Sequence, residues 1–364
     1  LLKTELTAFL DYEKYDPIGY NSGNSRNGYY HRTLKTKYGE IDVQIPRDRN
    51  GEFNQQTVSP YKRQTNDLET TVLQLYSKGI TTSEIADLIE KMYGHAYSPA
   101  TISNMTKIVE ENVTAFHQRP LNKRYAVIYC DATYLNVRRD SVSKEALHIL
   151  LGITPEGYKE IISFRLYPTE SSENYREMLQ DIQNRGVQQV LLFVSDGLKG
   201  LTQACLNHFP KAHYQPCWVH IIRNILRHVR ANEKSSVASH LREIHQARSL
   251  EEAQVKLEAF KEAMAKKYPK VVAILERTEY LFNYLSFPKA IQRSIYSTNI
   301  VEGYNKQLKK QTKRKEQFPN ESSLERFVCD HMIQYNHRFS NRIHKGFNVV
   351  QAELNEMFER QYSI

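Results

Sequence analysis

The apolar and polar positions of the chain form three successive patterns, and the first predicts a β-hairpin. After a polar, turn-rich opening stretch, residues 33–45 alternate in strand fashion around a turn at Tyr38 and Gly39. Three apolar residues after the turn then share one face of the second strand: Ile41, Val43 and Ile45. The hairpin is the one element that we expect in this part of the chain.

The second pattern, over residues 67–117, has the apolar spacing of three helices with short connections. The second helix begins with Thr81 and Glu84, which are placed to form a capping box. The third begins with Ser98 as its cap and Pro99 at the first helical position. Apolar residues at helical spacing predict one buried face on the second helix: Ile85, Leu88, Ile89 and Met92.

The third of these helices is expected to span residues 98–110. Its apolar residues Ile102, Met105 and Val109 point inward. Short polar or basic residues are left facing outward: Thr101, Ser103, Asn104 and Lys107. This arrangement is typical of a helix-turn-helix, whose last helix contacts base edges and phosphates. The alternative is a three-helix packing unit without that function.

The third pattern starts at Tyr125, where short apolar runs alternate with helices. Residues 126–130 and 190–194 are continuous apolar runs, as expected of strands buried on both faces of a sheet. A crossover helix lies before the second run, so we expect it to be parallel to a neighbour in the same sheet. The other expected strands lie at 146–153, 160–167 and 212–216. The expected helices lie at 173–185 and 198–209, and a long third helix ends at residue 230. The fold class is therefore α/β, a mixed five-stranded sheet flanked by helices.

Changes of composition divide the chain further. Residues 231–285 are rich in Glu, Ala, Lys and Leu and lack strand signals, so they predict an all-helical insertion. A basic helix follows from Thr298, and more helix follows a break at 318–320. We expect six successive parts: a hairpin region 1–64, a helix-turn-helix part 65–118, the first part of the α/β domain 119–230, the insertion 231–290, the completion of the α/β domain 291–340 and a helical tail 341–364.

The charge of the chain favours an anionic partner. Its 364 residues include 50 Lys and Arg against 41 Asp and Glu, a net charge of +9, which suits nucleic acid, although many soluble proteins are equally basic. Four cysteines without paired spacing fit a reducing cytoplasmic setting. No apolar run reaches the length of a membrane span. Because the chain begins with Leu1 rather than Met, we expect a natural segment to precede it.

Two aspartates follow the two buried runs: Asp131 comes directly after residues 126–130, and Asp196 comes shortly after 190–194. A buried carboxylate without a partner is costly. At the ends of neighbouring parallel strands, roughly 5 Å apart, the two would share a cation. Oxygen ligands without a His or Cys cluster favour Mg²⁺ or Mn²⁺ over zinc. Two such ions support phosphodiester chemistry, in which they activate a water or a 3′-hydroxyl.

A third carboxylate is needed to hold the second ion, and Glu302 is the best candidate. It lies near the start of a helix whose later residues are polar or basic: Asn305, Lys306, Lys309, Lys310, Lys313 and Arg314. A carboxylate beside a basic face suits a site that acts on a polyanion. The alternative is a surface glutamate that offsets the basic charge.

Four motifs in this order resemble the Mutator family of transposases, in its bacterial insertion-sequence branch. They are Tyr129-Cys130-Asp131-Ala132-Thr133-Tyr134, Val194-Ser195-Asp196-Gly197-Leu198-Lys199-Gly200, Cys217-Trp218-Val219-His220 and Ser297-Thr298-Asn299 through Glu302. The similarity extends from about residue 67 to about residue 330. The combination of motifs is far more specific than any one of them.

This resemblance implies an RNase H-like catalytic domain in which Asp131, Asp196 and Glu302 hold two Mg²⁺ or Mn²⁺ ions, with a helical insertion before the glutamate. It implies a DNA transposase that binds the terminal inverted repeats of its element, cleaves the element ends and joins them to target DNA. It also implies a homodimer or a larger assembly on paired ends. The alternatives are an RNase H-like nuclease or resolvase that cuts without strand transfer, and a domesticated DNA-binding regulator.

Cys217 and His220 form the Cys-x-x-His signature of that family. Two ligands are too few for a structural zinc site. We therefore expect His220 to orient a catalytic carboxylate or a DNA phosphate, Cys217 to pack, and Trp218 to lie in the core rather than on an extruded base. The residues expected to contact DNA are Arg47, Arg49, Thr101, Ser103, Asn104, Lys107, Lys199, Asn305, Lys306, Lys309, Lys310, Lys313 and Arg314.

Overall fold

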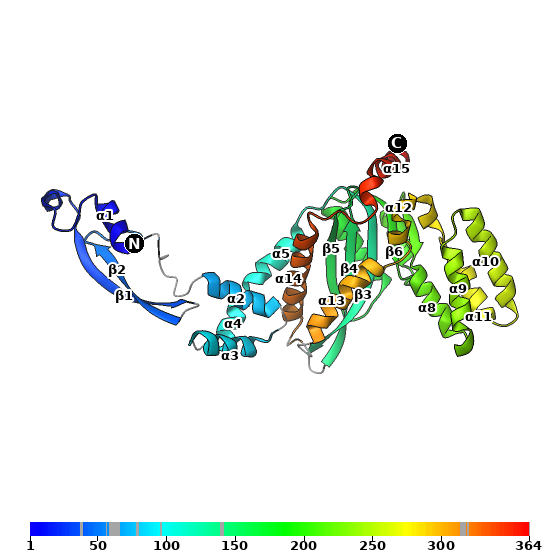
Figure 1. Ribbon diagram of the computed structural model, residues 1–364, viewed down its shortest axis with the longest axis horizontal. Coiled ribbons are helices and arrows are strands. Elements are labelled where there is room, and N and C mark those ends of the chain that lie inside the picture. The colour runs from blue at the N-terminus through cyan, green and yellow to red at the C-terminus, as the bar shows by residue number, and fades with distance from the viewer. Residues whose placement is uncertain are drawn as a thin grey trace. The chain divides into compact units, whose positions relative to one another are not determined.

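Two units make up the chain, Leu1–Glu110 and Glu111–Ile364 (Figure 1). The computed structural model describes residues 1–36, 39–55, 57, 66–77, 80–94, 97–138, 142–313, 318 and 320–363. Among these residues, no helix has both the length and the apolar character that a membrane crossing requires. The two units are described separately below.

The first unit begins with a helix and the expected hairpin. Strands β1 (Arg26–Thr36) and β2 (Gly39–Asp48) pair antiparallel, and Ile45 on β2 is fully buried. Tyr38 of the expected turn lies outside the described residues. Helix α1 (Leu2–Leu10) contacts β2 and buries two leucines. The sequence analysis missed this helix because its short apolar pattern stands among polar, turn-forming residues.

Further along the described chain lie the helices α2 (Asn66–Ser77), α3 (Thr82–Tyr93), α4 (Pro99–Thr106) and α5 (Ile108–Gln118). The expected capping box is present, since the Thr81 hydroxyl accepts from the Glu84 backbone N–H and the Glu84 carboxylate accepts from the Thr81 N–H. Ser98 caps α4, and Pro99 follows at its first position. Helices α2, α3 and α4 contact one another around a small apolar core.

Three details of these helices were predicted wrongly. The described residues of this stretch form four helices, α2 to α5, rather than three. The helix expected over 98–110 ends at Thr106, because the Lys107 N–H bonds to the Asn104 carbonyl only three residues back, a tightening that closes an α-helix. Met92 is 62% exposed rather than buried, because Gly94 ends α3 directly after this last turn. The side chain of Val109 lies outside the described residues.

The second unit is built on a mixed five-stranded sheet, as predicted, in the order β5-β4-β3-β6-β7. Strands β3, β4 and β5 are antiparallel neighbours, whereas β6 and β7 run parallel to β3. The strands are β3 (Arg124–Arg138), β4 (Val142–Ile153), β5 (Lys159–Tyr167), β6 (Gln189–Ser195) and β7 (His213–Pro216). Apolar residues alternate between two separate cores, one on each face of the sheet.

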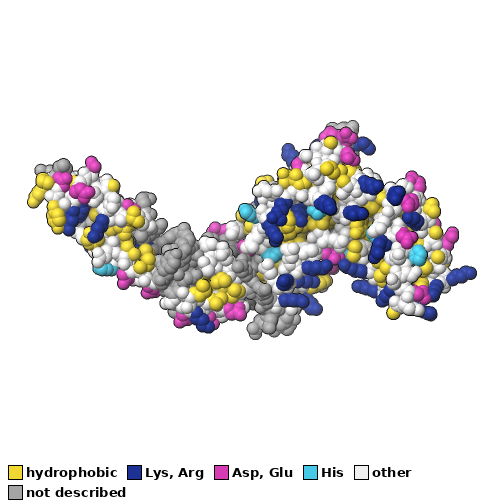
Figure 2. Space-filling model, viewed as in Figure 1, with side chains coloured by type: hydrophobic (Ala, Val, Ile, Leu, Met, Phe, Trp, Pro, Cys, Tyr) yellow, Lys and Arg dark blue, Asp and Glu magenta, His cyan; other side chains and the backbone are white. Residues whose placement is uncertain are grey.

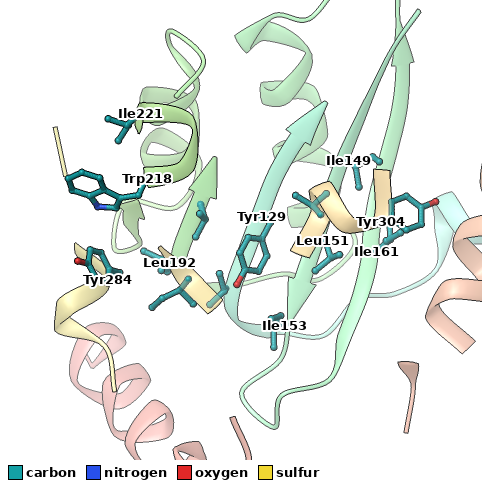
Figure 3. Close-up of a cluster of buried hydrophobic side chains, with 14 of the residues drawn as sticks. Tyr129, Ile149, Leu151, Ile153, Ile161, Leu192, Trp218, Ile221, Tyr284 and Tyr304 are labelled. Atoms are coloured by element: carbon teal, nitrogen blue, oxygen red, sulfur yellow. The ribbon is translucent and has the colours of Figure 1, made fainter. Parts of the chain in front are cut away.

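Helices cover both faces of this sheet. One core contains side chains of α6 (Ser172–Asn184) and α7 (Leu201–His208). The other contains side chains of α8 (Trp218–Arg227), α13 (Asn299–Thr312), α14 (Glu321–Phe339) and α15 (Gln351–Tyr362). Figure 3 shows part of this second core, with Tyr129 of β3, Leu192 of β6 and Tyr304 of α13.

The stretch between α8 and α13 is helical wherever it forms regular structure. It contains α9 (Lys234–His245), α10 (Leu250–Ala265), α11 (Pro269–Arg277) and α12 (Lys289–Ile295), together with short 3₁₀ turns. In Figure 1, α9, α10 and α11 form a layer beside α8, at one end of the unit. Contacts between residues divide the chain into two units only. The finer division into six parts stays a prediction.

Candidate active site

Asp131 lies inside β3 rather than after its end, which corrects the sequence prediction. Strand β3 continues to Arg138 because β4 pairs with it along that whole length, whereas the parallel pairing with β6 stops at Cys130 and Ser195. Asp131 and Asp196 are the next residues beyond this last parallel pair. The two aspartates are therefore neighbours, with Asp131 within β3 and Asp196 directly after β6, as the sequence analysis expected.

Asp131 is almost completely buried, with 7% of its surface exposed. The Asn305 amide Nδ2 donates a hydrogen bond of 2.7 Å to its Oδ2. Burial, and then the negative charge of Asp196, raise the pKa of Asp131 to about 7, although His220 acts in the opposite direction. A carboxylate kept in so unfavourable a position is typical of a functional site.

Helix α13 brings Glu302 and Asn305 to the same place. Its residues Val301, Tyr304 and Leu308 recur at helical spacing and are buried against the sheet. Asn305, which we expected to contact DNA, is instead buried, with 6% exposed. Its Oδ1 is buried too, and no described residue forms a hydrogen bond with that atom.

Two side chains of α8 contact Glu302. Arg223 donates two hydrogen bonds to its carboxylate, of 2.9 and 3.3 Å, and the His220 Nε2 lies 3.5 Å from Oε1. The Glu302 side chain is 13% exposed, and its charge contributes to the raised pKa of Asp131. All three predicted acids therefore lie within electrostatic reach of one another.

The Cys-x-x-His motif connects the end of β6 to the start of α13. The Cys217 N–H donates to the Ser195 carbonyl at 2.7 Å, and the Thr298 N–H and hydroxyl donate to the Cys217 Sγ at 3.3 and 3.4 Å. A hydrogen bond with Cys217 raises the pKa of His220. Burial opposes ionisation of Cys217, but the hydrogen bonds from His220 and Thr298 outweigh it and lower the pKa of the thiol. The motif thus fixes the imidazole that contacts Glu302.

Trp218 lies in the core, with 0% of its surface exposed. Its Nε1–H donates a hydrogen bond of 2.7 Å to the Leu281 carbonyl, and its ring packs near Phe282 and His245. Figure 3 draws the indole in the same cluster of buried side chains as Tyr284. This placement fits the expected core role.

Glu170 is a further candidate for the site, and the sequence analysis missed it. It lies in the turn between β5 and α6, directly before Ser171, the cap of α6. Its Oε1 is buried, and the described residues offer that atom no hydrogen-bond partner. Burial, and then the charge of Asp196, raise the pKa of Glu170 to about 7. In the sequence, this glutamate is indistinguishable from the ordinary acid of a helix start.

A basic surface adjoins the acids. Four lysines of the α13 segment are exposed: Lys306, Lys309, Lys310 and Lys313. Figure 2 shows Lys and Arg side chains gathered over this helix. Other exposed residues expected to contact DNA are Arg47, Arg49, Asn104, Lys107 and Lys199, whereas Thr101 and Ser103 are half-buried and Arg314 lies outside the described residues.

The carboxylate oxygens are suitable ligands for a hard divalent cation, but they are not arranged as a complete metal site. Within the described ranges, no three His, Cys, Asp or Glu side chains are already arranged to hold a metal ion. The Glu302 carboxylate forms an ion pair with Arg223 instead of lying in a metal site with the two aspartates. The oxygen-only donor set, together with the unpartnered Oδ1 of Asn305 and Oε1 of Glu170, suits Mg²⁺ or Mn²⁺.

Comparison with known proteins decides the family. The sequence profile of the family described as "Transposase, Mutator family" matches residues 1–341. The chain belongs to the Mutator family of transposases. This confirms the resemblance carried by the four motifs.

Several relatives come from bacterial insertion sequences. The chain is 47% identical over 359 residues to the transposase for insertion sequence element IS905 of Lactococcus lactis, covering 99% of this chain and 92% of that protein. It is 44% identical over 336 residues to the transposase for IS1201 of Lactobacillus helveticus, covering 92% and 91%. Among solved structures, the Drosophila P element transposase strand transfer complex aligns with a TM-score of 0.32 and 12% identity, over 80% of this chain and 85% of that one.

Proposed function

We propose that this Mutator-family transposase cuts DNA at the ends of its element and joins the freed 3′-hydroxyl to a second DNA strand. The observation that carries the proposal is the convergence of Asp131, Asp196 and Glu302 at the point where β6 ends beside β3. We further propose that the domain is RNase H-like. The order of the elements supports that assignment. Three antiparallel strands, β3 to β5, are followed along the chain by two strands that run parallel to β3. The acids lie on β3, directly after β6 and on α13.

Each residue of the site has a distinct role in this proposal. Asp131 and Asp196 would share one Mg²⁺ or Mn²⁺, and Glu302 would complete the site of a second after leaving Arg223. Bound there, the ions supply an activated water or 3′-hydroxyl and stabilise the leaving oxygen. Asn305 orients Asp131, and His220, fixed by Cys217, positions Glu302.

DNA binding would use separate surfaces. The exposed lysines of α13 lie next to the acids and would contact phosphates near the cut. Helices α3 and α4 would act as a helix-turn-helix on the terminal inverted repeats. Joining two element ends requires both in one complex, so we propose that at least two copies assemble on paired ends.

Strand transfer tests the proposal. A labelled, pre-cut element end is incubated with the full chain, a target plasmid and Mg²⁺, and joined products are resolved on a denaturing gel. We expect joining that EDTA abolishes and Mg²⁺ or Mn²⁺ restores. Cutting of uncut ends without any joining would identify a nuclease instead, and specific binding without either reaction would identify a regulator.

Glu170→Gln is expected to weaken metal use without unfolding the protein. We propose that Glu170 supports the metal site near Asp196, because its buried oxygen has no partner in the described structure. Loss of a residue that supports metal ligands costs about 10- to 100-fold in affinity or activity. The half-saturating Mg²⁺ concentration for cleavage should rise, while the melting temperature stays or increases, since an unpaired buried acid has been removed. An unchanged Mg²⁺ requirement would remove Glu170 from the site.

A further inference from the structure

A pocket of about 600 Å³ opens directly beside the proposed catalytic acids. Asp196 and His220 line one part of it. Its other walls include α8 and, in the helical insertion, the end of α11 and the three residues that follow it. The insertion therefore contributes to a cavity that begins at Asp196, and neither the motifs nor the proposed metal chemistry explain this cavity.

Two of the three arginines that line the pocket have no acidic partner among the described residues. Arg223, Arg227 and Arg277 line it, and Arg223 is paired with Glu302. Arg227 and Arg277 are exposed, and within the described parts of the chain neither has an acidic partner at ion-pair distance. The acids in the lining are Asp196 and Glu279. Unpaired guanidinium groups facing a cavity are suited to bind phosphate.

Tyr280 adds an aromatic wall held in a strained conformation. Its φ of 62° is left-handed, which is costly for a bulky residue. The backbone of the next residue, Leu281, is held in place because its carbonyl accepts hydrogen bonds from the Trp218 and Gln215 side chains. Tyr280 keeps 40% of its surface exposed and meets the buried Tyr214 ring edge to face at 6.2 Å. The surrounding core thus holds an exposed ring beside the arginines.

We propose that this pocket binds an unpaired nucleotide of the DNA strand next to the scissile phosphate, with its phosphates on Arg227 and Arg277 and its base against Tyr280. The inference rests on the proposed function. The volume lies within the range of about 300–1,000 Å³ typical of pockets that enclose a small ligand, whereas a duplex binds along an open surface. A base that leaves the duplex stacks readily on an aromatic ring, whatever its identity.

Base extrusion is measured without cutting. Duplexes of the element end carry 2-aminopurine at one of the three nucleotides on either side of the cut, and the full chain is added with Ca²⁺ in place of Mg²⁺. We expect the fluorescence to rise at one position, and the rise to disappear in the double variant Arg227→Ala/Arg277→Ala. The matched control Arg242→Ala, an exposed arginine of α9, should keep it. No rise at any position, or a full rise in the double variant, would overturn the proposal.

Cleavage in Mg²⁺ then tests the base contact. Replacing the extruded nucleotide with an abasic site should slow the native chain by about 5- to 150-fold, which corresponds to base stacking of about 1–3 kcal/mol. Tyr280→Ala should cut both substrates at the same reduced rate. Equal sensitivity to the abasic site in the native chain and in Tyr280→Ala would contradict the base contact. If the native chain cuts no element end at all, the proposed function fails rather than the pocket.

Discussion

Asp196→Asn is expected to lower the cleavage rate of an element end by at least about 10³-fold, because losing a metal ligand removes several kcal/mol of transition-state stabilisation. The substitution keeps the shape of the side chain and removes its charge, so DNA binding should remain. The measurement is the single-turnover rate on a labelled end in Mg²⁺, with DNA affinity determined in parallel by gel shift.

Glu243→Gln is the matched control, since it removes one negative charge from an exposed position on α9 in the same unit. It should cut at the native rate. Cleavage by Asp196→Asn within a few-fold of this control, with equal DNA affinity, would contradict a catalytic role for Asp196.

Trp218→Ala should produce the largest loss of stability. The indole is fully buried, and truncating a buried aromatic residue costs about 3–5 kcal/mol. The Leu281 carbonyl also loses its hydrogen bond from the indole. Urea unfolding, followed by circular dichroism, measures the change in the free energy of unfolding.

Trp218→Phe keeps much of the ring and loses the N–H donor, so its loss should be smaller. Both variants should lose cleavage only in proportion to unfolding. A Trp218→Ala protein that keeps its stability but no longer cuts would place the indole on DNA instead of in the core.

The strands and the acids were accessible from the sequence for a physical reason. Continuous apolar runs mark strands buried on both faces, and carboxylates after two such runs stand out as costly. The neighbouring positions of Asp131 and Asp196 followed from this pattern. The length of β3 could not be predicted from this pattern, because it depends on how far β4 continues to pair with β3 beyond Asp131.

Other parts of the site depend on tertiary contacts that no local pattern reveals. Glu170 stands one residue before a helix cap, where an acid is ordinary, and only its buried oxygen singles it out. Asn305 could have been recognised, since it lies within the buried stripe of Val301, Tyr304 and Leu308, where a polar side chain needs a partner. Its neighbouring lysines led instead to the expectation of a DNA contact.

Mapping the metal site by iron cleavage tests the central claim most directly. Fe²⁺ replaces Mg²⁺ in the full chain, and ascorbate with peroxide then generates radicals that cut the backbone close to the bound ion. We predict fragments ending near residues 131, 196 and 302 together, suppressed by excess Mg²⁺ and lost in Asp196→Asn. Fragments near only one of these positions, or a pattern unchanged in Asp196→Asn, would show that the three acids do not hold a common metal site.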